Sequence, residues 1–441
     1  MKKAVAAISL ILILAGAGFP YVKGVVLERM LRQSVDRANQ SFQDTGQDYA
    51  IAIERYEKGY SGSVIEWTLD LGVLKPVLGR EKIILVDHVS HGYGTIVSHT
   101  SLEKNPGFKD VIDRYLDGRN PLTITTEYSL AGDMVSTITL SDFFIAGDSG
   151  VLNVQPGSLK IELNKDMNRA ASVLMWQGMN MGDAAEVSGI TATARLSKVT
   201  DLIWEGVSKF NIDTVFVSEK GNTLEMDSVT AGYDLTHETA SSTLTMEMDL
   251  GVGRLVSDQV QIDTGAVKVR IAHLDLGGLE ELIRLNTRLQ ADVLKAMAEA
   301  GKGSAGANQV LERQMRQMGL QMMGTYEKFL RKGLQVNISE LYAKIPQGEI
   351  KAGLFLGLKK NMTMAGFLPV LMQPAMVLDL FSLRSDIKIP YELVGYHPNL
   401  LLPLYDGMKT GLFLVDDRQL VHQAEIRDNK LYLNREEVVL E

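Results

Sequence analysis

Apolar and polar side chains alternate over much of the chain from Tyr49 onward, a pattern typical of strands with one buried face. In three stretches the alternation stops at a turn and then resumes, which predicts β-hairpins. These stretches are residues 51–71 around a turn at 58–62, 122–140 around 131–133, and 244–271 around 251–253. Hairpins that follow one another along the chain predict a meandering antiparallel sheet.

Helical spacing replaces the alternation just after the N-terminal apolar run. The apolar positions that recur there are Val25, Val26, Leu27, Met30, Leu31, Val35 and Ala38. They predict an amphipathic helix over residues 24–45. One interpretation is that this helix packs its apolar stripe on the body of the protein, and the other is that it acts as a lever or an interfacial helix.

Helical spacing returns at residues 277–334. A first helix is expected over 279–297 and a second over 308–334, joined by a small-residue connector at 301–306. The second helix carries a methionine cluster at Met315, Met318, Met322 and Met323. Such a stripe is compatible with core packing or with an adaptable contact surface.

The patterns together predict an α+β fold. A long antiparallel, meandering β-sheet dominates it, with an N-terminal membrane helix and an inserted α-helical hairpin. The expected organisation is a membrane anchor or signal segment at 1–23, the amphipathic helix at 24–45 and a β-rich periplasmic region at 46–276. The helical hairpin at 277–334 follows, and a C-terminal β-rich region at 335–441 completes the same body.

The N-terminus has the features of an export segment. Lys2 and Lys3 precede an uncharged run of about 19 residues at 4–22, which spans roughly 28 Å as a helix and is just long enough to cross a bilayer. Ala15–Gly16–Ala17 also fits a signal-peptidase site, so cleavage after Ala17 is the alternative. Either way, the basic N-terminus places the body outside the cytoplasm.

Composition excludes several classes of protein. The formal net charge of −9 and the absence of a concentrated basic stretch argue against a nucleic-acid partner. The chain has no cysteine, which excludes disulfides, thiolate metal sites, cysteine nucleophiles and lipoprotein acylation.

Three short motifs suggest chemistry, and each fails on its spacing or context. Gly301–Lys302–Gly303–Ser304 lacks the spacing of a phosphate-binding loop. His88 and His91, with His99 beyond them, suggest a metal, but positions three apart on a strand point to opposite faces. A hydrogen-bonded histidine is therefore the simpler interpretation of His91, and we expect no metal site and no cofactor.

The third motif pairs Ser101-x-x-Lys104 with Lys409–Thr410–Gly411, as in penicillin-binding enzymes. That family also requires an S-D-N element, which has no convincing counterpart between the two. A serine acyl-enzyme is therefore only a distant third hypothesis, and we expect no catalytic residues.

The order of several weak motifs resembles a family of bacterial envelope proteins of unknown function, the YdgA-like proteins. The motifs include Tyr56-x-x-Gly59 with Gly62–Ser63, the His-Gly segment at 89–92, the turn at 129–133 and the closing stretch 429–434. The sequence departs from the family pattern at Ser61, where Phe is expected, and after Gly92, where Pro is expected. The resemblance implies an inner-membrane protein of a Gram-negative bacterium with a single anchor, a periplasmic body and no established catalytic residues.

The leading functional hypothesis is a non-enzymatic envelope protein that binds lipid, or another apolar or extended ligand, along a groove of the sheet. The alternative is an envelope scaffold or assembly factor that makes protein contacts through the helical hairpin. The expected partners are thus the membrane and a lipid or an envelope protein, and a homo-oligomer is compatible with both hypotheses.

Overall fold

The computed structural model describes residues 2–45, 47–72, 82–102, 105–147, 150–258, 260–300, 319, 321–366, 370, 373, 375–396 and 398–439. Side chains are described from residue 20 onward, except at 45, 111, 291, 292, 294–300, 395, 396 and 398–403. The chain forms two compact units. Unit 1 comprises Met1–Met179, Thr193–Leu202 and Asn286–Met315. Unit 2 comprises Asn180–Ala192, Ile203–Leu285 and Arg316–Glu441.

Unit 1 begins with a long helix and continues as short strands. Its elements are α1 (Lys2–Thr45), β1 (Ala50–Lys58), β2 (Gly62–Asp70), β3 (Lys82–Ser90), β4 (Ile96–Ser101), α3 (Pro106–Tyr115), β5 (Leu122–Tyr128), β6 (Met134–Leu140), β7 (Phe143–Gly147), β8 (Gly150–Val154) and β9 (Gly157–Leu163), together with most of β10 (Arg169–Met181). Strand β11 (Ala185–Lys198) is divided between the two units.

The sheet of unit 1 is antiparallel. Its strands pair in the order β1, β2, β3, β4, β5, β6, β9 and β10, with β7 and β8 as a hairpin between β6 and β9. The first two predicted hairpins are confirmed as β1–β2 and β5–β6. Gly132, in the turn between β5 and β6, has a φ of +99°, a conformation that favours glycine.

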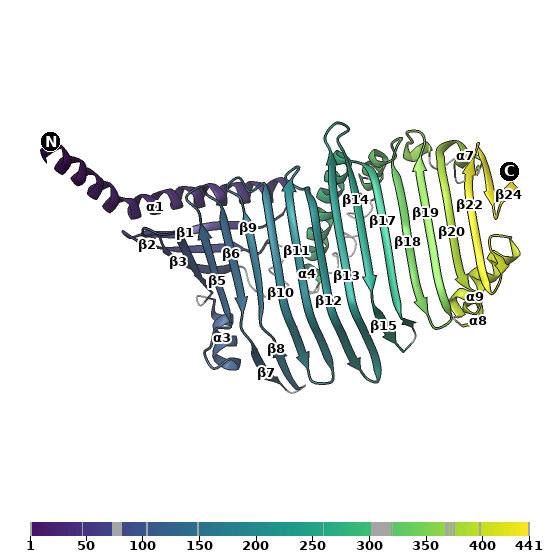
Figure 1. The fold of residues 1–441 in the computed structure, drawn as a ribbon, viewed down its shortest axis with the longest axis horizontal. Helices are drawn as coiled ribbons and strands as arrows, with labels where there is room; N and C mark the ends of the chain where they lie inside the picture. The colour runs from purple at the N-terminus through teal and green to yellow at the C-terminus, as the bar shows by residue number, and fades with distance from the viewer. Residues whose placement is uncertain are drawn as a thin grey trace. The chain divides into compact units, whose positions relative to one another are not determined.

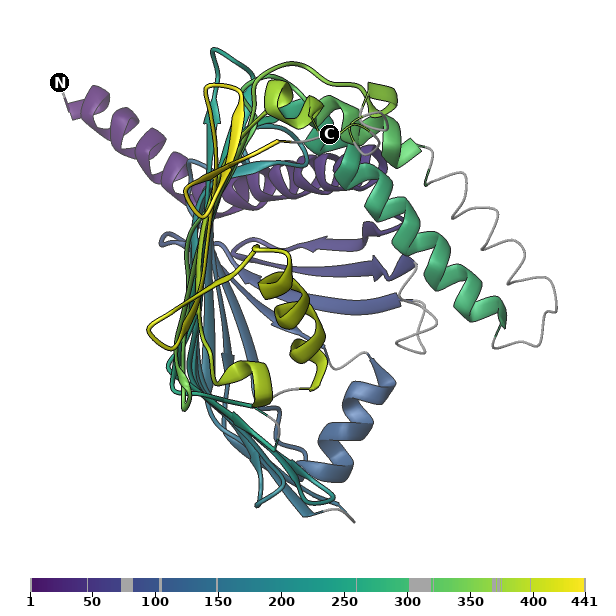
Figure 2. The same ribbon diagram turned by 90° about the vertical axis from the view of Figure 1, so that its right-hand side faces the viewer.

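Helix α1 runs alongside β1 (Figures 1 and 2) and covers the sheet with its apolar stripe. Leu27 and Leu31 are buried against the sheet with Ile65, Val89 and Tyr128. The interpretation of residues 24–45 as a helix packed on the body is therefore confirmed. The burial follows from the sequence, because positions four apart lie on one face of a helix.

Unit 2 has longer strands. Its elements are β12 (Trp204–Glu219), β13 (Asn222–Glu238), β14 (Thr243–Val252), β15 (Arg254–Ser257), β16 (Gln261–Ile262), β17 (Thr264–Asp275), the first turns of α4 (Leu276–Ala300), β18 (Gln335–Ile345), β19 (Gly348–Leu358), α7 (Met376–Leu380), β20 (Phe381–Pro390), α8 (Leu393–Tyr396), α9 (Pro398–Lys409), β21 (Leu414–Asp416), β22 (Gln419–Arg427), β23 (Lys430–Leu433) and β24 (Glu436–Val438). Residues 321–329 are also helical.

The sheet of unit 2 is also an antiparallel meander, with strands in the order β12, β13, β14, β17, β18, β19, β20, β22, β23 and β24. The third predicted hairpin is confirmed in its pairing, because β14 pairs with β17. Its turn is more elaborate than expected, since β15 leaves β14 to pair with the far end of β13 before β17 begins. Figure 2 shows α8 and α9 on one face of this sheet.

The predicted helical hairpin at 277–334 is described in part. Helix α4 and residues 321–329 are helical, whereas residues 301–318, with the connector, Met315 and Met318, lie outside the described residues. Lys328 pairs with Glu281, which joins the two helical segments of unit 2, and Arg331 pairs with Asp275 at 2.7 Å. Leu330 and Leu334 then pack on a small core of Leu358, Met362 and Val370.

The N-terminal segment and the amphipathic segment form one continuous helix, α1. Within the described part of the chain, no helix has both the length and the hydropathy that a membrane span requires. The side chains of residues 2–19 lie outside the description. The predicted anchor is therefore without support from the structure and stays a prediction.

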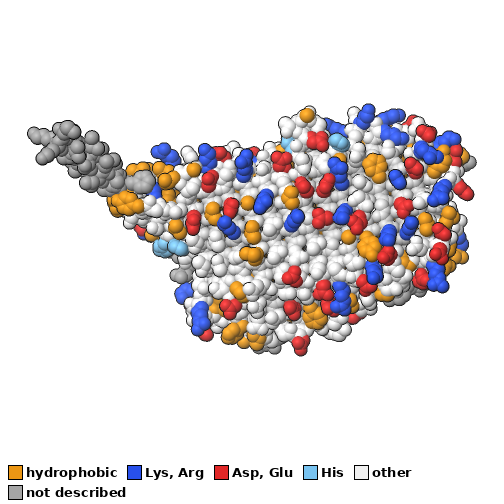
Figure 3. All heavy atoms as spheres, viewed as in Figure 1, with side chains coloured by type: hydrophobic (Ala, Val, Ile, Leu, Met, Phe, Trp, Pro, Cys, Tyr) orange, Lys and Arg blue, Asp and Glu red, His pale blue; other side chains and the backbone are white. Residues whose placement is uncertain are grey.

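Charges of both signs are interspersed over the face seen in Figure 3. Ion pairs join neighbouring strands of unit 2, including Arg270–Glu247 at 3.2 Å and Lys268–Glu340 at 2.7 Å. Exposed pairs of this kind contribute at most about 1 kcal/mol each. They favour solubility more than stability.

Candidate functional site

An apolar pocket of about 430 Å³ lies between α1 and the sheet within unit 1. This volume is within the range of roughly 300–1,000 Å³ that is usual for small-molecule sites. The residues that line it are Met30, Leu31, Ser34, Val35, Ala38, Ile51, Trp67, Thr68, Leu69, Leu85, Tyr128, Gly132, Met134, Leu163, Asn164, Lys165 and Met167. Most of them are hydrocarbon or aromatic, so the pocket suits an apolar ligand.

The apolar stripe of α1 forms one wall. Met30, Leu31, Val35 and Ala38, which line the pocket, are spaced so that they share one face of the helix. Leu31 is buried, whereas the side chains of Met30, Val35 and Ala38 keep partial exposure. The sheet thus covers only part of this apolar stripe, and the uncovered part faces the pocket.

A buried acid lies behind the opposite wall. The indole Nε1 of Trp67 donates a hydrogen bond of 2.8 Å to Asp87 Oδ2, and Thr100 Oγ1 donates to Asp87 Oδ1 at 2.5 Å. Burial raises the pKa of Asp87 above its usual value, although these hydrogen bonds act in the opposite direction. Burial, with the nearby Asp87 charge, also raises the pKa of Tyr128. Trp67 and Tyr128 both line the pocket, and the hydrogen bond to Asp87 holds the indole of Trp67 in place.

Asn39 joins the helix to the edge of the sheet. Its Nδ2 donates to the carbonyl of Ile51, and its Oδ1 accepts from the N–H of Ile51, both at 2.8 Å. The amide side chain thereby replaces a neighbouring strand beside β1. Because Ile51 lines the pocket, this contact fixes the separation of the two walls on that side.

A buried histidine holds the same helix nearer its N-terminal end. His91 Nε2 lies 2.9 Å from Ser63 Oγ, and His91 Nδ1 lies 2.9 Å from the carbonyl oxygen of Pro20 in α1. Since a carbonyl only accepts, Nδ1 carries the proton and Nε2 accepts from the serine hydroxyl. The helix can approach because Gly24 faces the ring, where a Cβ would lie 2.9 Å from His91 Cε1.

Three further contacts complete this arrangement, which we call the helix clamp. Tyr56 donates to the carbonyl of Gly24 at 3.1 Å, and the buried Lys23 donates to the carbonyl of Gly92 at 3.0 Å. Lys58 forms an ion pair of 3.0 Å with Glu28. This hydrogen bond from Lys58 is the main cause that lowers the pKa of the Glu28 carboxyl.

Some of the motifs that carried the family resemblance meet at the clamp, whereas the closing stretch 429–434 belongs to unit 2. Tyr56, Ser63 and His91 all make the contacts just described, although they come from three separate strands or strand ends. Gly132, from the turn motif at 129–133, contacts the pocket, where an added Cβ would lie 3.3 Å from Met30 Cε and 2.9 Å from Lys165 Cβ. Their structural role is thus to position α1.

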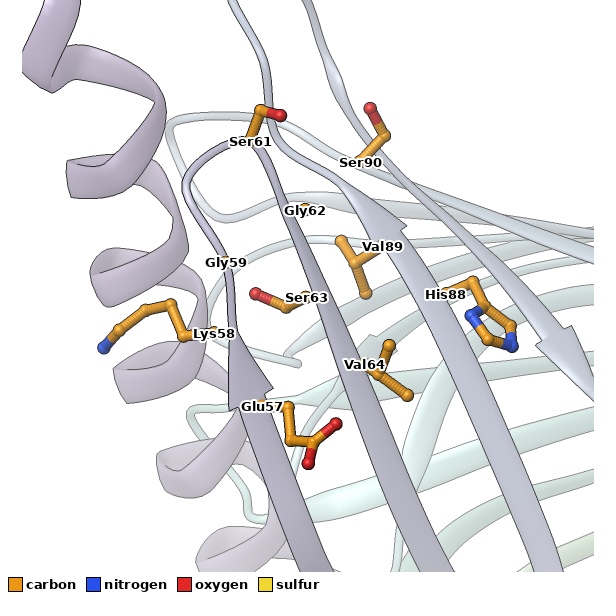
Figure 4. A pocket seen from close by; sticks show the side chains of 10 residues that line it. All are labelled: Glu57, Lys58, Gly59, Ser61, Gly62, Ser63, Val64, His88, Val89 and Ser90. Carbon is orange, nitrogen blue, oxygen red and sulfur yellow. The ribbon is translucent and has the colours of Figure 1, made fainter.

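A second, more polar hollow of about 620 Å³ lies at the tip of the β1–β2 hairpin (Figure 4). Glu57, Lys58, Ser61, Ser63, His88 and Ser90 contribute its polar side chains. In Figure 4, Lys58 extends toward the helix and His88 points away from it. His88 and His91 therefore do not converge, and His91 is a hydrogen-bonded histidine as expected.

The Ser63–His91 pair has the spacing of a catalytic dyad but not its access. Ser63 is 4% exposed and His91 is fully buried, with the second ring nitrogen held by a helix carbonyl. A nucleophile must reach a substrate carbonyl, and very little of Ser63 is exposed although the residue borders the hollow of Figure 4. The pair is best understood as a structural contact.

The other sequence motifs do not form a described site. Ser101 ends β4 in unit 1, Lys104 lies outside the described residues, and Lys409 belongs to unit 2. The Gly301–Ser304 motif also lies outside them. Among the residues that the structure describes, no group of three or more acidic or histidine side chains could hold a metal.

The fold and the pocket define a β-sheet protein whose N-terminal helix closes an apolar cavity. The chain belongs to the family described as a bacterial protein of unknown function (DUF945), whose model matches residues 1–441. No curated protein and no solved structure gives a significant match to the chain. A bacterial family without an assigned function is thereby confirmed, and the finer likeness to YdgA-like envelope proteins stays a prediction.

Proposed function

We propose that the protein binds the acyl chain of a lipid in the pocket between α1 and the sheet of unit 1, without catalysing a reaction. The observation that carries this proposal is the apolar lining of a cavity of about 430 Å³. Each CH₂ group transferred there from water contributes about 0.8 kcal/mol. An acyl chain is the common cellular molecule with the most such groups for its width.

The helix clamp and the Asn39 contact support the proposal because together they fix the position of α1, one wall of the pocket, before a ligand binds. Asn39 and His91 tether α1 to strands at separate points along the helix. A wall held in this way loses little freedom on binding, so more of the burial energy is available as affinity. A simple packing defect would need no such bracing.

We further propose that the pocket lies close to the periplasmic face of the bacterial inner membrane. The uncharged run at 4–22 belongs to the same helix as the pocket wall, and Met30 follows its end by about 12 Å of helical rise. Tyr21, Tyr60 and Tyr93 are 48%, 56% and 68% exposed. Tyrosine is favoured at the level of lipid headgroups, which suits this end of the unit.

The test is to purify the full chain in a mild detergent and quantify the lipid that remains bound by mass spectrometry. The wild type should retain about one lipid per chain. Ala38→Trp should lose it, because the indole fills the pocket. The matched control is Gln33→Trp on the exposed side of α1, which should retain the lipid. A wild-type protein without enriched lipid would contradict the proposal.

A scaffold or assembly factor remains the second candidate. Met323 and Tyr326 are 44% and 42% exposed on the helical segment 321–329. Side chains of this kind are enriched at protein interfaces. This candidate predicts that a protein, or a second copy of the chain, copurifies in place of lipid.

A further inference from the structure

We infer that the ligand of the pocket is an anionic amphiphile, bound with its tail inside and its negatively charged head at Lys165. This inference rests on the proposed function and specifies the chemical class of its ligand. The shared chemistry is a carboxylate or phosphate head on a single acyl chain.

Lys165 places a positive charge at the mouth. Of the described residues that line the pocket, it is the only one with a charged side chain. It is exposed to water although its stem lines the cavity, so its ammonium group lies at the solvent side. Among the described residues, no acidic side chain forms an ion pair with that ammonium group.

The backbone fixes where this lysine lies. The N–H of Lys165 donates to Asp133 Oδ1 at 3.0 Å, and its Cβ packs against Gly132 in the β5–β6 turn. Asp133 itself does not line the pocket. Its Oδ1 accepts the Lys165 N–H and so orients the loop, and among the described residues no ion pair joins Asp133 to the Lys165 ammonium group.

The interior of the pocket is unsuited to a head group. The Trp67 N–H is already donated to Asp87, and the Thr68 hydroxyl is donated to Glu54 at 2.7 Å. The Asn164 side chain is bonded to Asn168 at 2.6 Å. Apart from Lys165, the remaining polar side chains of the described lining are the hydroxyls of Ser34 and Tyr128, and neither carries a positive charge. A charged head placed inside would therefore have no ionic partner and would lie near the carboxylate of Asp87, which is unfavourable.

Polarity therefore orients the ligand. The tail lies among the apolar side chains of α1 and the sheet, and an anionic head meets Lys165 at the water boundary. For a neutral amphiphile of the same length, only the burial of the acyl chain contributes to the binding free energy. Selectivity for the anion should then depend on this one lysine.

The experiment measures binding of palmitate and methyl palmitate to the full chain in one nonionic detergent at pH 8, by displacement of a fluorescent fatty acid. The acid and the ester partition differently into micelles, so each affinity is corrected for the partition of that ligand, measured in the same detergent without protein. The wild type should favour palmitate by about fivefold, the upper end for an exposed ion pair. Lys165→Gln should reduce this ratio to about one without weakening the ester.

Lys160→Gln is the matched control. Lys160 is an exposed lysine of β9 that is paired with Glu162 and does not line the pocket. The Lys160→Gln variant loses the same charge as Lys165→Gln and should keep the fivefold preference for palmitate. Palmitoyl lysophosphatidate forms a third arm, and the head with the larger loss in Lys165→Gln is the preferred one.

Equal binding of acid and ester by the wild type, or an unchanged preference in Lys165→Gln, would overturn the inference and leave the proposed function intact. Failure of all three ligands to bind would refute the proposed function, and the inference with it.

Discussion

Asn39 makes two hydrogen bonds of 2.8 Å to the backbone of Ile51, so one helix side chain satisfies both the donor and the acceptor of an edge-strand residue. Unpaired edge groups invite pairing with other chains, and here the helix covers them. The contact also sets one side of the pocket, since Ile51 is part of its lining.

Replacing Asn39 with Leu should lower the free energy of unfolding by about 1–3 kcal/mol, because two backbone groups lose their partners. Chemical denaturation measures the change. Gln40→Leu, at the exposed neighbouring position, should remain within about 0.5 kcal/mol of the wild type. Equal effects of the two variants would show that the Asn39 contact contributes nothing particular.

Replacing His91 with Leu should lower the free energy of unfolding by about 2–4 kcal/mol, more than the Asn39 change. The reason is that Ser63 and the Pro20 carbonyl are left buried without their partner. His88→Leu, on the exposed face of β3, provides the control and should change stability little.

Gly24→Ala tests the same contact from the helix side. Its Cβ would lie 2.9 Å from the His91 ring, so the helix must shift. Combined with His91→Ala, the two effects should be clearly less than additive, because the clash disappears with the ring. Strict additivity would mean that the helix does not rest on His91.

Gly132→Ala should destabilise the protein and reduce lipid retention. Its φ of +99° disfavours a side chain by about 1–3 kcal/mol, and the new Cβ would also crowd Lys165 and Met30. Gly118→Ala separates the two effects, since Gly118 has a φ of +75° with no atom within 4 Å of the added Cβ. The control should lose stability but keep its lipid, and loss of lipid in both variants would contradict a local role for Gly132.

Asp87 should make stability depend on pH in an unusual direction. Its pKa is raised in the folded state, so the folded protein binds the proton more readily than the unfolded chain. Stability relative to Asp87→Asn should therefore rise as pH falls through the folded pKa, and level off near the unfolded value of about 4. Urea unfolding of both proteins between pH 8 and pH 4 measures this difference. A constant difference, or one that shrinks on acidification, would contradict the assignment.

Local patterns predicted much of the fold. Alternation identified the hairpins β1–β2 and β5–β6, since one-sided burial of a sheet requires a period of two. The helical stripe likewise identified Met30, Leu31, Val35 and Ala38, which line the pocket. The segment joining β14 to β17 was not predicted in detail, because β15 pairs with a distant part of β13.

The rest of the site depends on contacts between residues far apart in sequence. The role of Asp87 has no local signal, because its partners Trp67 and Thr100 are selected by the register of β2, β3 and β4. Asn39 and Lys165 carry no local signal, because an asparagine on a helix and a lysine in a turn are ordinary surface residues. Only the packing of α1 gives them a role.

The pocket beside α1 should hold an acyl chain in the living cell. A photoreactive benzoylphenylalanine at position 38, irradiated in living bacteria, tests it most directly, with the same residue at Gln33 as the control. A lipid-sized mass should be added to the peptide that contains position 38, and no such adduct should form at position 33. A protein adduct at position 38, or equal lipid labelling at both positions, would contradict it.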